Sequence, residues 1–416
     1  MKLDTEEQAM RAGEFGPLRQ WAIAHQIKVG HYLGAEDFVP VGQAHIMADT
    51  ESLGAAGVEW LESWAVLPEK QRRVRIPTIT DPRGTDFAAA ARLKQQPWML
   101  DLERRAIVAF EAFGVLMTNT CINYQTIMPP VRGEHCAYGD TGVVIYSNGV
   151  CGARSNFEGG PSALSAGLTG RTPRYGYHLD EHRLATLIVE VDSTPHDLSE
   201  WGALGGIAGR LAGDYWQVPL LIGIDRTPNS DEMKHFGAAL ASFGSVALFH
   251  MAGITPEAVR IEDVVPPGVT LPSHEVDEAA VRAFRTRYAA DAREAIDVVV
   301  FSAPQLSLLE MRDLAAMLDG RRATIPLLAV TSPQVKPDAD RMGFTARIEG
   351  AGGTVLSGMC FYQSYAREMA EANGWRRLAT NSAKLTNILG GYGYIPALLA
   401  MEECVRIACA GGKREQ

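Results

Sequence analysis

Thiol, acid, imidazole, guanidinium and amide side chains gather between residues 118 and 177 of this 416-residue chain. The segment T-N-T-C-I-N-Y (118–124) holds Cys121, and G-E-H-C-A-Y-G-D (133–140) holds Glu134 and His135. After the alternating apolar run V-V-I-Y-S-N comes a second polar stretch, G-A-R-S-N-F-E-G-G-P-S-A-L (152–164). Glycine at this density usually holds the backbone close to a ligand or supplies turns with positive φ. An α/β scaffold presents its chemistry on such loops between apolar strands.

Two of the six cysteines are candidate metal ligands. Cys121 lies in a turn after the apolar helical run 106–117, where a thiolate suits a soft metal or an iron–sulfur cluster. Cys360 ends the strand T-V-L-S-G-M-C, and the carboxyl end of a parallel strand is where α/β ligands gather. Each is also compatible with a small buried hydrophobe. If both bind one metal, their sulfur atoms must meet in the fold.

The other cysteines carry less information. Cys404 and Cys409 lie on the final helix at neighbouring turns and are expected in the core, whereas Cys136 and Cys151 are ambiguous. No C-x-x-C pair occurs, and the cysteines are sparse for the length. Reduced thiols in the cytoplasm therefore fit better than a disulfide framework.

Further polar residues are candidates for catalysis and substrate binding. His45 follows a strand and His135 stands beside Glu134, so these three are candidate acids, bases or ligands, with a structural role as the alternative. Arg154 and its neighbours in the glycine-rich turn can bind a carboxylate or stabilise the turn. T-N-S-A-K can cap a helix whose amino end binds an anion, with a plain capped helix as the alternative. The candidate substrate contacts are Thr120, Arg154, Ser155, Asn156, Ser382 and Lys384.

Strands and helices alternate along the chain, which predicts an α/β fold. Examples are the expected strands 39–46 and 74–80 with a helical segment between them, and the strong strand 185–192. We divide the chain into an N-terminal α/β region (1–105), a central α/β region with the glycine-rich loops (106–265) and a C-terminal α/β region (276–416). A segment rich in proline and valine, 262–275, is a plausible linker.

Composition excludes several classes of function. The net charge is −10, from 39 basic and 49 acidic residues, which argues against a nucleic-acid partner. No apolar stretch of about 18 residues occurs, so no membrane span is expected. The start, M-K-L-D-T-E-E-Q, lacks the pattern of a secretory signal. We therefore expect a cytoplasmic protein.

The polar segments, taken together and in order, resemble the large catalytic component of the aconitase X family. The likeness covers nearly the whole chain and rests on these motifs: E-E-Q-A-M-R-A-G-E-F-G, G-A-E-D-F-V-P-V-G-Q-A-H-I, T-N-T-C-I-N-Y, R-G-E-H-C-A-Y-G-D-T-G, G-A-R-S-N-F-E-G-G-P-S-A-L, L-T-G-R-T-P-R-Y-G-Y-H-L-D and N-S-A-K. The resemblance implies an aconitase-like multi-layer α/β body that closes against a small swivelling domain carrying a serine base. The segment before Gln416 is similar to the end of the large component, so we expect the swivel domain on a separate small subunit.

Members of the family dehydrate hydroxy acids, and this implies an iron-dependent hydro-lyase. T-N-T-C-I-N-Y, V-V-F-S-A-P-Q-L-S-L-L-E and G-M-C-F-Y are closer in character to the branch acting on cis-3-hydroxy-L-proline, so a pyrroline carboxylate is the expected product. The alternative substrate is mevalonate 5-phosphate. An alternative of another class is a non-catalytic subunit that binds a metal or ligand.

The resemblance also assigns Cys121 and Cys360 as iron or iron–sulfur ligands, but with one departure. Relatives have Gly-Cys-Pro-His where this chain has Ser302-Ala303-Pro304-Gln305. A cysteine and a histidine are missing there, so a three-thiolate cluster would need its third ligand from another cysteine. A mononuclear iron and a two-iron cluster both remain open.

Overall fold

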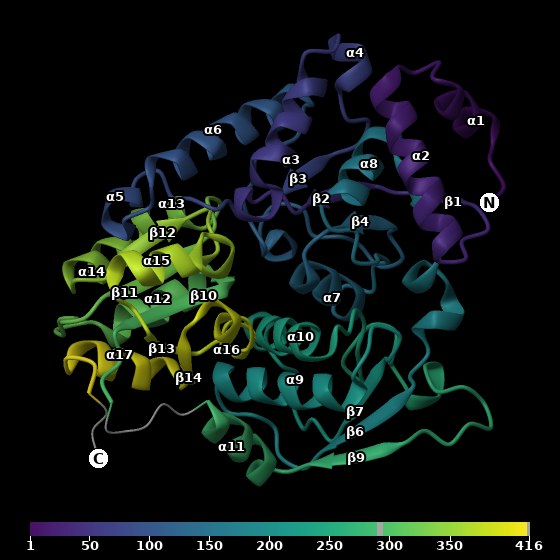
Figure 1. Cartoon of the computed structure of the whole chain (residues 1–416). Helices are drawn as coiled ribbons and strands as arrows, with labels where there is room; N and C mark the ends of the chain where they lie inside the picture. Colours follow the sequence, from purple (N-terminus) through teal and green to yellow (C-terminus); the bar gives the residue numbers. More distant parts are fainter. Residues whose placement is uncertain (289–293, 414–416) are drawn as a thin grey trace.

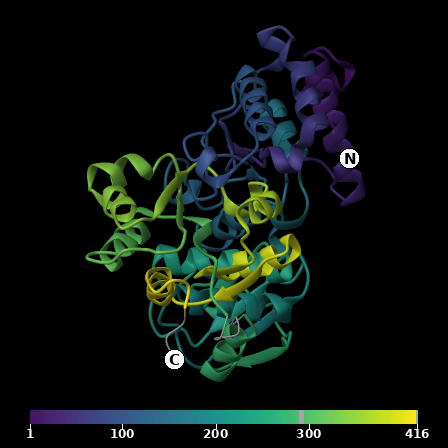
Figure 2. The same cartoon turned by 60° about the vertical axis from the view of Figure 1, so that its left-hand side comes forward.

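The computed structural model describes residues 1–288 and 294–413, where parallel sheets and helices form packed layers (Figures 1 and 2). The predicted α/β fold class is confirmed. The division into regions 1–105, 106–265 and 276–416 stays a prediction, and its last region includes residues 289–293 and 414–416, which lie outside the described ones. Within the described ranges, no helix combines the length and the apolar character that a bilayer-crossing segment requires.

The first part of the chain forms a three-stranded parallel sheet in the order β3-β2-β4 and an antiparallel pair, β1 with β5. Helices α2, α3, α6 and α8 pack around this sheet (Figure 1). The elements are α1 (Thr5–Ala12), α2 (Pro17–Tyr32), β1 (Phe38–Pro40), β2 (Gln43–Ile46), α3 (Thr50–Ala65), α4 (Glu69–Arg72), β3 (Thr78–Thr80), α5 (Ala90–Leu93), α6 (Pro97–Ala112), β4 (Cys136–Tyr138), α7 (Thr141–Gly149), α8 (Pro161–Thr169) and β5 (Arg171–Pro173).

The middle of the chain forms a second parallel sheet in the order β8-β7-β6-β9. Its elements are β6 (Leu187–Val191), α9 (Leu198–Ala212), β7 (Pro219–Ile222), α10 (Ser230–Gly244), β8 (His250–Met251), β9 (Ser273–Val276) and α11 (Glu278–Arg287). The glycines of α9 let it lie against α10: a Cβ on Gly205 would come within 2.2 Å of the Phe236 carbonyl oxygen. The glycine-rich run 202–209 therefore forms a helix face that packs closely on α10.

The last part forms a five-stranded parallel sheet in the order β12-β11-β10-β13-β14, with helices on both faces (Figure 2). Its elements are β10 (Val298–Leu306), α12 (Leu308–Met317), β11 (Leu327–Thr331), α13 (Lys336–Arg341), α14 (Phe344–Gly350), β12 (Thr354–Ser357), α15 (Ala366–Asn373), β13 (Arg377–Thr380), α16 (Ala383–Leu389), β14 (Ile395–Leu398) and α17 (Met401–Cys409). Short 3₁₀ turns η1 (Asn123–Gln125) and η5 (Phe361–Gln363) follow the two candidate ligand cysteines.

Two segments differ from what the sequence pattern suggests. The alternating apolar run after Asp140 forms helix α7, because Asp140 caps it by accepting a hydrogen bond from the Val143 N–H at 3.0 Å. The helix is buried nearly all round, so its sequence has no polar face to show a helical period. The expected linker 262–275 is also partly regular, because residues 273–275 pair with β6 as part of β9.

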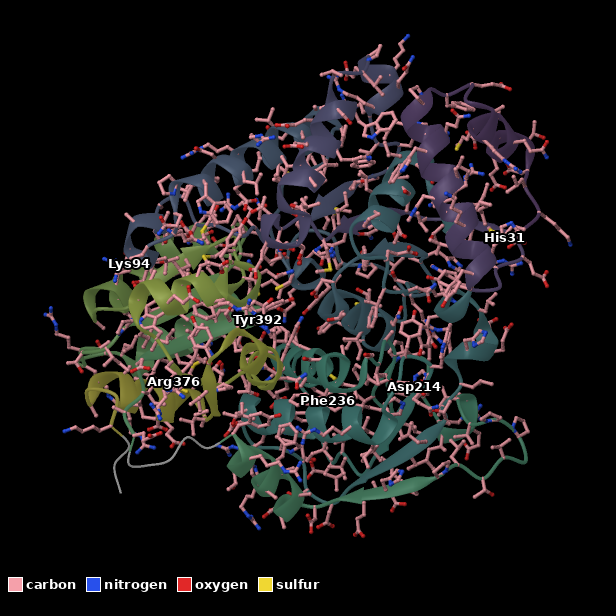
Figure 3. All side chains as sticks on the ribbon, viewed as in Figure 1. His31, Lys94, Asp214, Phe236, Arg376 and Tyr392 are labelled. Carbon is pink, nitrogen blue, oxygen red and sulfur yellow. The ribbon has the colours of Figure 1, made fainter. Side chains whose placement is uncertain are left out.

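Side chains fill the space between the layers throughout (Figure 3). Phe236, labelled there, is fully buried between Trp201 and Phe249, at ring-centroid distances of 6.4 and 4.9 Å. This packing fixes α10 against α9 and the second sheet. Helix α10 in turn supports the end of β10, where candidate site residues lie.

Candidate active site

Polar side chains from two sheets meet at the carboxyl ends of their strands. From the first sheet, His45 lies on β2, Asp81 directly follows β3, and Asp140 lies two residues after β4. From the third sheet, Ser302 and Gln305 lie near the end of β10. The carboxyl ends of parallel strands are the usual place for ligands in α/β folds.

The two candidate ligand cysteines come together at Gln305, although they are far apart in sequence. The Gln305 backbone N–H points at Cys121 Sγ at 3.5 Å, and its Oε1 accepts a hydrogen bond from the Cys121 N–H at 3.3 Å. Its Nε2 donates to the carbonyl of Met359, the residue before Cys360, at 3.1 Å. Ser302 Oγ lies 3.8 Å from Cys360 Sγ. The structure therefore brings the two cysteine loops together at Gln305.

Both thiols are buried, with 6% of Cys121 and 1% of Cys360 exposed. Burial raises the pKa of Cys121 well above its usual value, and the neighbouring Cys360 raises it further. Burial raises the pKa of Cys360 to about 12, while Lys384 acts in the opposite direction. The thiols therefore hold their protons when no metal is present, and a metal would have to displace them.

A buried ion pair lies next to the thiols. Lys384 Nζ is 3.4 Å from Asp140 Oδ1 and 5.4 Å from the centroid of the Tyr362 ring. Burial opposes the charge of Lys384, but Asp140 raises its pKa above the usual value. Burial alone raises the pKa of Asp140, yet Lys384 and the hydrogen bond from the Val143 N–H bring it below its usual range. At neutral pH the pair is charged.

His45 and Asp81 form the other half of the site. His45 is fully buried, and its Nε2 donates to the Thr120 carbonyl oxygen at 2.9 Å, an assignment that fits the neutral imidazole. Burial lowers the pKa of His45. Asp81 Oδ2 accepts a hydrogen bond from Gln363 Nε2 at 2.8 Å, whereas Oδ1 lies 3.8 Å from His45 Nε2 and has no hydrogen-bond partner within residues 1–288 and 294–413. Burial raises the pKa of Asp81 well above its usual value, and Asp140 adds to the effect.

Sequence reasoning missed Asp81, Asp140 and Tyr362. The signal for Asp81 was present, because it follows a strand directly, as a ligand-binding residue of an α/β fold often does. The position of Asp140 in the sequence is explained by helix capping alone, a role that any Asp before a helix can have. Tyr362 follows Cys360 but carries no sequence pattern of its own.

Several predicted residues lie in a different place. Arg154 pairs with Asp180 and donates to the His178 carbonyl oxygen at 3.1 Å, on a groove of about 530 Å³ that Arg132 and Glu257 also line. His135 Nδ1 lies 2.9 Å from His178 Nδ1, and burial lowers both pKa values. The structure does not bring Arg154 or His135 into contact with the thiols or Lys384.

The remaining predicted contacts serve mainly the backbone. Glu134 accepts from Gln43 Nε2 and from the Val131 N–H, each at 3.0 Å. Ser155 Oγ accepts from the Tyr138 N–H at 3.0 Å, and Asn156 Oδ1 accepts from the Tyr215 hydroxyl at 2.7 Å. These three residues support the loops behind the site.

Thr120 and Ser382 lie at the site, but their polar groups form hydrogen bonds with neighbouring segments of the chain. Thr120 supplies the carbonyl oxygen that accepts from His45, and its hydroxyl accepts from the Ile122 N–H at 3.0 Å. Ser382 caps α16 and donates to the Ala303 carbonyl oxygen at 2.5 Å. Ser382 thereby fixes Lys384, two residues later, relative to the end of β10.

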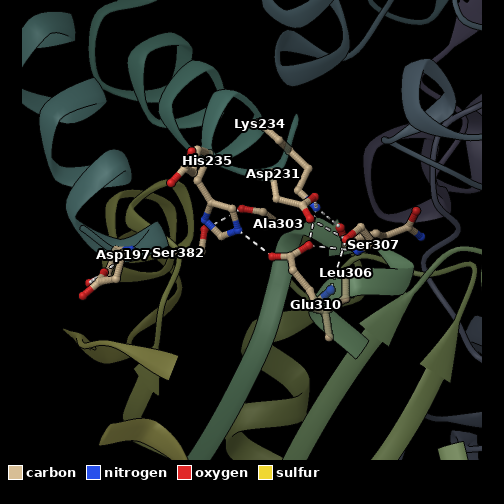
Figure 4. A network of polar contacts seen from close by, with 12 residues as sticks. Asp197, Asp231, Lys234, His235, Ala303, Leu306, Ser307, Glu310 and Ser382 are labelled. Atoms are coloured by element: carbon tan, nitrogen blue, oxygen red, sulfur yellow. Dashed lines mark hydrogen bonds and ion pairs between the residues drawn. The ribbon is translucent and has the colours of Figure 1, made fainter. Parts of the chain in front are cut away.

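A second buried polar cluster holds β10 from the other side (Figure 4). Lys234 of α10 is fully buried, donates to the Gln305 carbonyl oxygen at 3.2 Å, and pairs with Asp231 at 3.0 Å and with Glu310. Despite burial, Lys234 lowers the pKa of Asp231 to about 2. Glu310 also lies 2.8 Å from His235 Nε2, and Ser307 donates to Asp231 at 2.7 Å. This Lys234 cluster joins α10, β10 and α12.

The donors at the site fit some metal centres and not others. Cys121 and Cys360 offer two buried thiols, while Ala303, near the end of β10, offers no ligand. Among residues 1–288 and 294–413, no group of three or more His, Cys, Asp or Glu residues is arranged to hold a metal ion. A cluster held by three cysteines therefore does not fit. A centre held by two thiolates, with its other positions open, does fit.

Comparison with known proteins identifies the family. The models of the aconitase X first, second and third domains match residues 1–181, 185–286 and 296–410. The chain is 33% identical to the phosphomevalonate dehydratase large subunit of Methanothermobacter thermautotrophicus, over 96% of this chain and 95% of that protein. It is 29% identical to the cis-3-hydroxy-L-proline dehydratase of Pseudomonas aeruginosa, over 99% of this chain and 70% of that protein.

A solved structure agrees with these sequence relationships. The holo-form of Thermococcus kodakaraensis aconitase X matches with a TM-score of 0.88 and 29% identity, over 98% of this chain and all of that chain. The expected aconitase-like architecture is thus confirmed. The order of the three family domains, the buried thiol pair and the shared fold lead to one conclusion: the chain belongs to the aconitase X family.

Proposed function

We propose that this chain is the metal-binding large subunit of a dehydratase that removes water from mevalonate 5-phosphate. The observation that carries a dehydratase function is the thiol pair Cys121–Cys360 beside the buried Lys384–Asp140 pair. The choice of substrate is supported by relatives named phosphomevalonate dehydratase large subunit, 33% and 32% identical to the chain. These relatives favour the alternative of the sequence analysis over its first choice, cis-3-hydroxy-L-proline.

The chemistry explains why these groups are needed. Removing water from a 3-hydroxy acid requires a base for the proton next to the carboxylate and help for hydroxide, which is a poor leaving group. Iron held by Cys121 and Cys360 would supply a Lewis acid for the second task. Lys384 is the buried cation that can bind the substrate carboxylate and stabilise the negative charge that develops on it.

The chain's own residues prepare this site. Asp140 orients Lys384, while Ser382 fixes the start of its helix. His45 holds the Cys121 loop by its bond to the Thr120 carbonyl, and its burial keeps the ring neutral. Gln305 sets the spacing of the two cysteine loops. These contacts hold the buried thiols and Lys384 in place before a substrate binds.

The proposal includes a separate small subunit that closes on this site and supplies the base. It is supported by the relatives whose names include "large subunit". The chain spans about 70% of the length of the cis-3-hydroxy-L-proline dehydratases it matches, so those proteins contain further sequence. We place the complex in the cytoplasm, since all six cysteines are free thiols.

A second candidate substrate, cis-3-hydroxy-L-proline, is favoured by the charges at the site. Lys384 is paired with Asp140, which leaves its positive charge largely balanced. Asp140 is charged at neutral pH and would repel a phosphate. The same carboxylate would attract the ammonium group of an amino acid.

The test uses the large chain co-expressed with its small subunit, purified without oxygen and supplied with iron. The complex is incubated with mevalonate 5-phosphate and, separately, with cis-3-hydroxy-L-proline, and the products are followed by NMR. We expect dehydration of mevalonate 5-phosphate. Turnover of hydroxyproline alone would establish the second candidate instead. Activity that persists without iron and in Cys121→Ala would leave the chain as a non-catalytic binding subunit.

A further inference from the structure

The glycine-rich motifs R-G-E-H-C and G-A-R-S-N meet at a place other than the thiol pair. They run side by side, and the Gly133 N–H donates to the Gly152 carbonyl oxygen at 2.8 Å. Arg132 of the first motif and Arg154 of the second line the groove of about 530 Å³. The proposed dehydratase function does not use this groove.

The groove lies where the first two family domains meet. Its walls come from residues 132–180 on one side and from residues 183–264 on the other. The models of the first and second aconitase X domains match residues 1–181 and 185–286. Ligand pockets occur preferentially at such junctions, and their usual volume is about 300–1,000 Å³. The position and the size of the groove therefore suit a small molecule.

One wall of the groove is a buried and fixed ion pair. Arg183 is 3% exposed, and its Nε and Nη2 donate to the Glu257 carboxylate at 3.0 and 2.6 Å. Its Nη1 donates to the Tyr177 carbonyl oxygen at 3.1 Å. Arg183 and Glu257 thus neutralise each other, and they hold the wall in one position without a ligand.

The other wall offers positive charge that is not firmly paired. Arg132 is exposed, and no carboxylate among residues 1–288 and 294–413 forms an ion pair with it. Arg154 pairs with Asp180, whose side chain is 85% exposed. An ion pair with such an exposed partner contributes little to stability, so an incoming anion can replace Asp180. The groove therefore presents two guanidinium groups to a ligand.

Glycine is required where the two motifs form this wall. Gly152 has a φ of +68°, a conformation that residues with a Cβ rarely adopt. A Cβ there would also lie 3.2 Å from Arg132 Cγ and 3.1 Å from Pro256 Cγ. A side chain at position 152 would therefore displace residues that line the groove.

We propose that this Arg132–Arg154 groove binds an oxyanion group, a phosphate or a carboxylate, of a small molecule. Each guanidinium presents its N–H groups in a plane, which matches two oxygens of either anion. The described residues that line the groove include neither the two thiols nor Lys384. The groove is thus a second site, and its assignment does not depend on the dehydratase function.

The test is calorimetric titration of the full chain at a fixed, low ionic strength. The chain is kept free of metal, because the probes chelate iron. The probes are inorganic phosphate, pyrophosphate and citrate, and we expect saturable binding of at least one. Arg132→Met should weaken that binding by about tenfold or more, the usual effect of losing a hydrogen bond to a charged group. Arg132→Lys, which keeps the charge but not the planar fork, should recover part of the affinity.

Arg341→Met is the matched control, because it removes an exposed arginine from α13, where Arg341 pairs with Asp338. It changes the net charge equally and should leave the affinity unchanged. Val259→Glu places a carboxylate at a 65% exposed position of the groove and should abolish binding.

The three probes also identify the anion. Binding of phosphate or pyrophosphate but not citrate assigns a phosphate ligand, and the reverse assigns a carboxylate ligand. Binding of both classes supports an oxyanion site that accepts either. The proposal is overturned if no probe binds, if Arg132→Met and Arg341→Met bind equally well, or if Val259→Glu keeps the wild-type affinity.

Discussion

At the scale of single residues, the site depends on two thiols that the rest of the chain cannot replace. Cys121 and Cys360 are both buried, and Ala303 near the end of β10 offers no third thiol. The other four cysteines have different surroundings, and Cys409, for example, lies on α17. Each of the two thiols should therefore be essential for iron.

We predict that Cys121→Ser and Cys360→Ser each abolish stoichiometric iron binding, measured as iron per chain after anaerobic purification. Serine is a harder and far less acidic ligand than a thiol, so it does not suit this metal. Cys409→Ser is the control and should retain the wild-type iron content. Equal iron in all three variants would contradict a two-cysteine centre.

Burial of Glu158 gives a prediction about pH and stability. Burial raises its pKa from 4.5 to about 7. Since the folded state binds this proton more tightly than the unfolded state, Glu158 favours folding below pH 4.5, and this contribution is lost as the pH rises to about 7. The free energy of unfolding falls by about 3 kcal/mol at most over this pH range.

Glu158→Gln should remove that part of the pH dependence. Denaturant unfolding at pH 4.5, 6 and 8 measures it, with the change read as the difference between variant and wild type at each pH. Glu14→Gln, at an exposed glutamate, should leave the profile unchanged. A variant whose profile parallels that of the wild type would show that Glu158 ionises normally.

The sequence identified some of these residues and misplaced others. Cys121, Cys360, His45 and Lys384 do meet, because each belongs to or adjoins the carboxyl end of a strand or the start of a helix at the same edge. Arg154 and His135 lie close to Cys121 in sequence, but Arg154 lines the groove of about 530 Å³ and His135 contacts His178. Spacing along the chain does not reveal on which side of a sheet a loop lies.

At the scale of elements, the end of β10 organises the site. Gln305 uses its whole carboxamide to join the Cys121 loop to the Cys360 loop, and Lys234 fixes its carbonyl from behind. In this chain, Gln305 appears as a spacer for the ligands and not as a ligand itself.

We predict that Gln305→Ala weakens metal binding by about tenfold or more, because supporting contacts to a metal site typically contribute 10–100-fold in affinity. Titration of the metal-free chain with Co²⁺, followed by thiolate-to-cobalt absorption, measures this. Gln334→Ala is the matched control, since Gln334 donates to the Thr118 carbonyl at 2.9 Å but touches neither cysteine. Equal metal affinities for both variants would show that the two cysteine loops keep their positions without Gln305.

Element types were predictable where periodicity was clear and less so in the interior. The polar residues of α10 give its sequence a helical spacing although most of the helix is buried, whereas α7 has no polar face to reveal it. The apolar segment 245–251 forms only the two-residue strand β8. Apolar character alone cannot separate a buried helix or loop from a buried strand.

At the scale of the whole molecule, the Lys234 cluster joins the second and third sheets. Asp231 and Glu310 are both buried and depend on Lys234 for charge balance. Removing one partner of a buried ion pair leaves an uncompensated charge, which usually costs 3–5 kcal/mol.

Lys234→Met should therefore lower the free energy of unfolding by about 3–5 kcal/mol, measured by urea denaturation. The control is Lys336→Met, which removes a more exposed pair with Asp340 and should cost less than about 1 kcal/mol. Similar small losses in both variants would indicate that water or proton uptake compensates the buried carboxylates.

The proposed division of labour between subunits is also testable at this scale. If the base belongs to the small subunit, the purified 416-residue chain should be slower than the complex by about 10²–10⁴-fold or more. Steady-state dehydration assays with and without the partner measure the ratio. Full turnover by the chain alone would place the base among its own residues.

The convergence of Cys121 and Cys360 has a consequence for the newly made protein. The two residues are 239 positions apart, so at roughly 5–20 residues per second the ribosome needs on the order of 10–50 s to make the second after the first. During this interval the Cys121 thiol has neither its partner nor the cover of β10. Oxidants and other metal ions can reach the thiol during this interval. Oxidation or incorrect metal binding at Cys121 is therefore more favourable during synthesis than after folding.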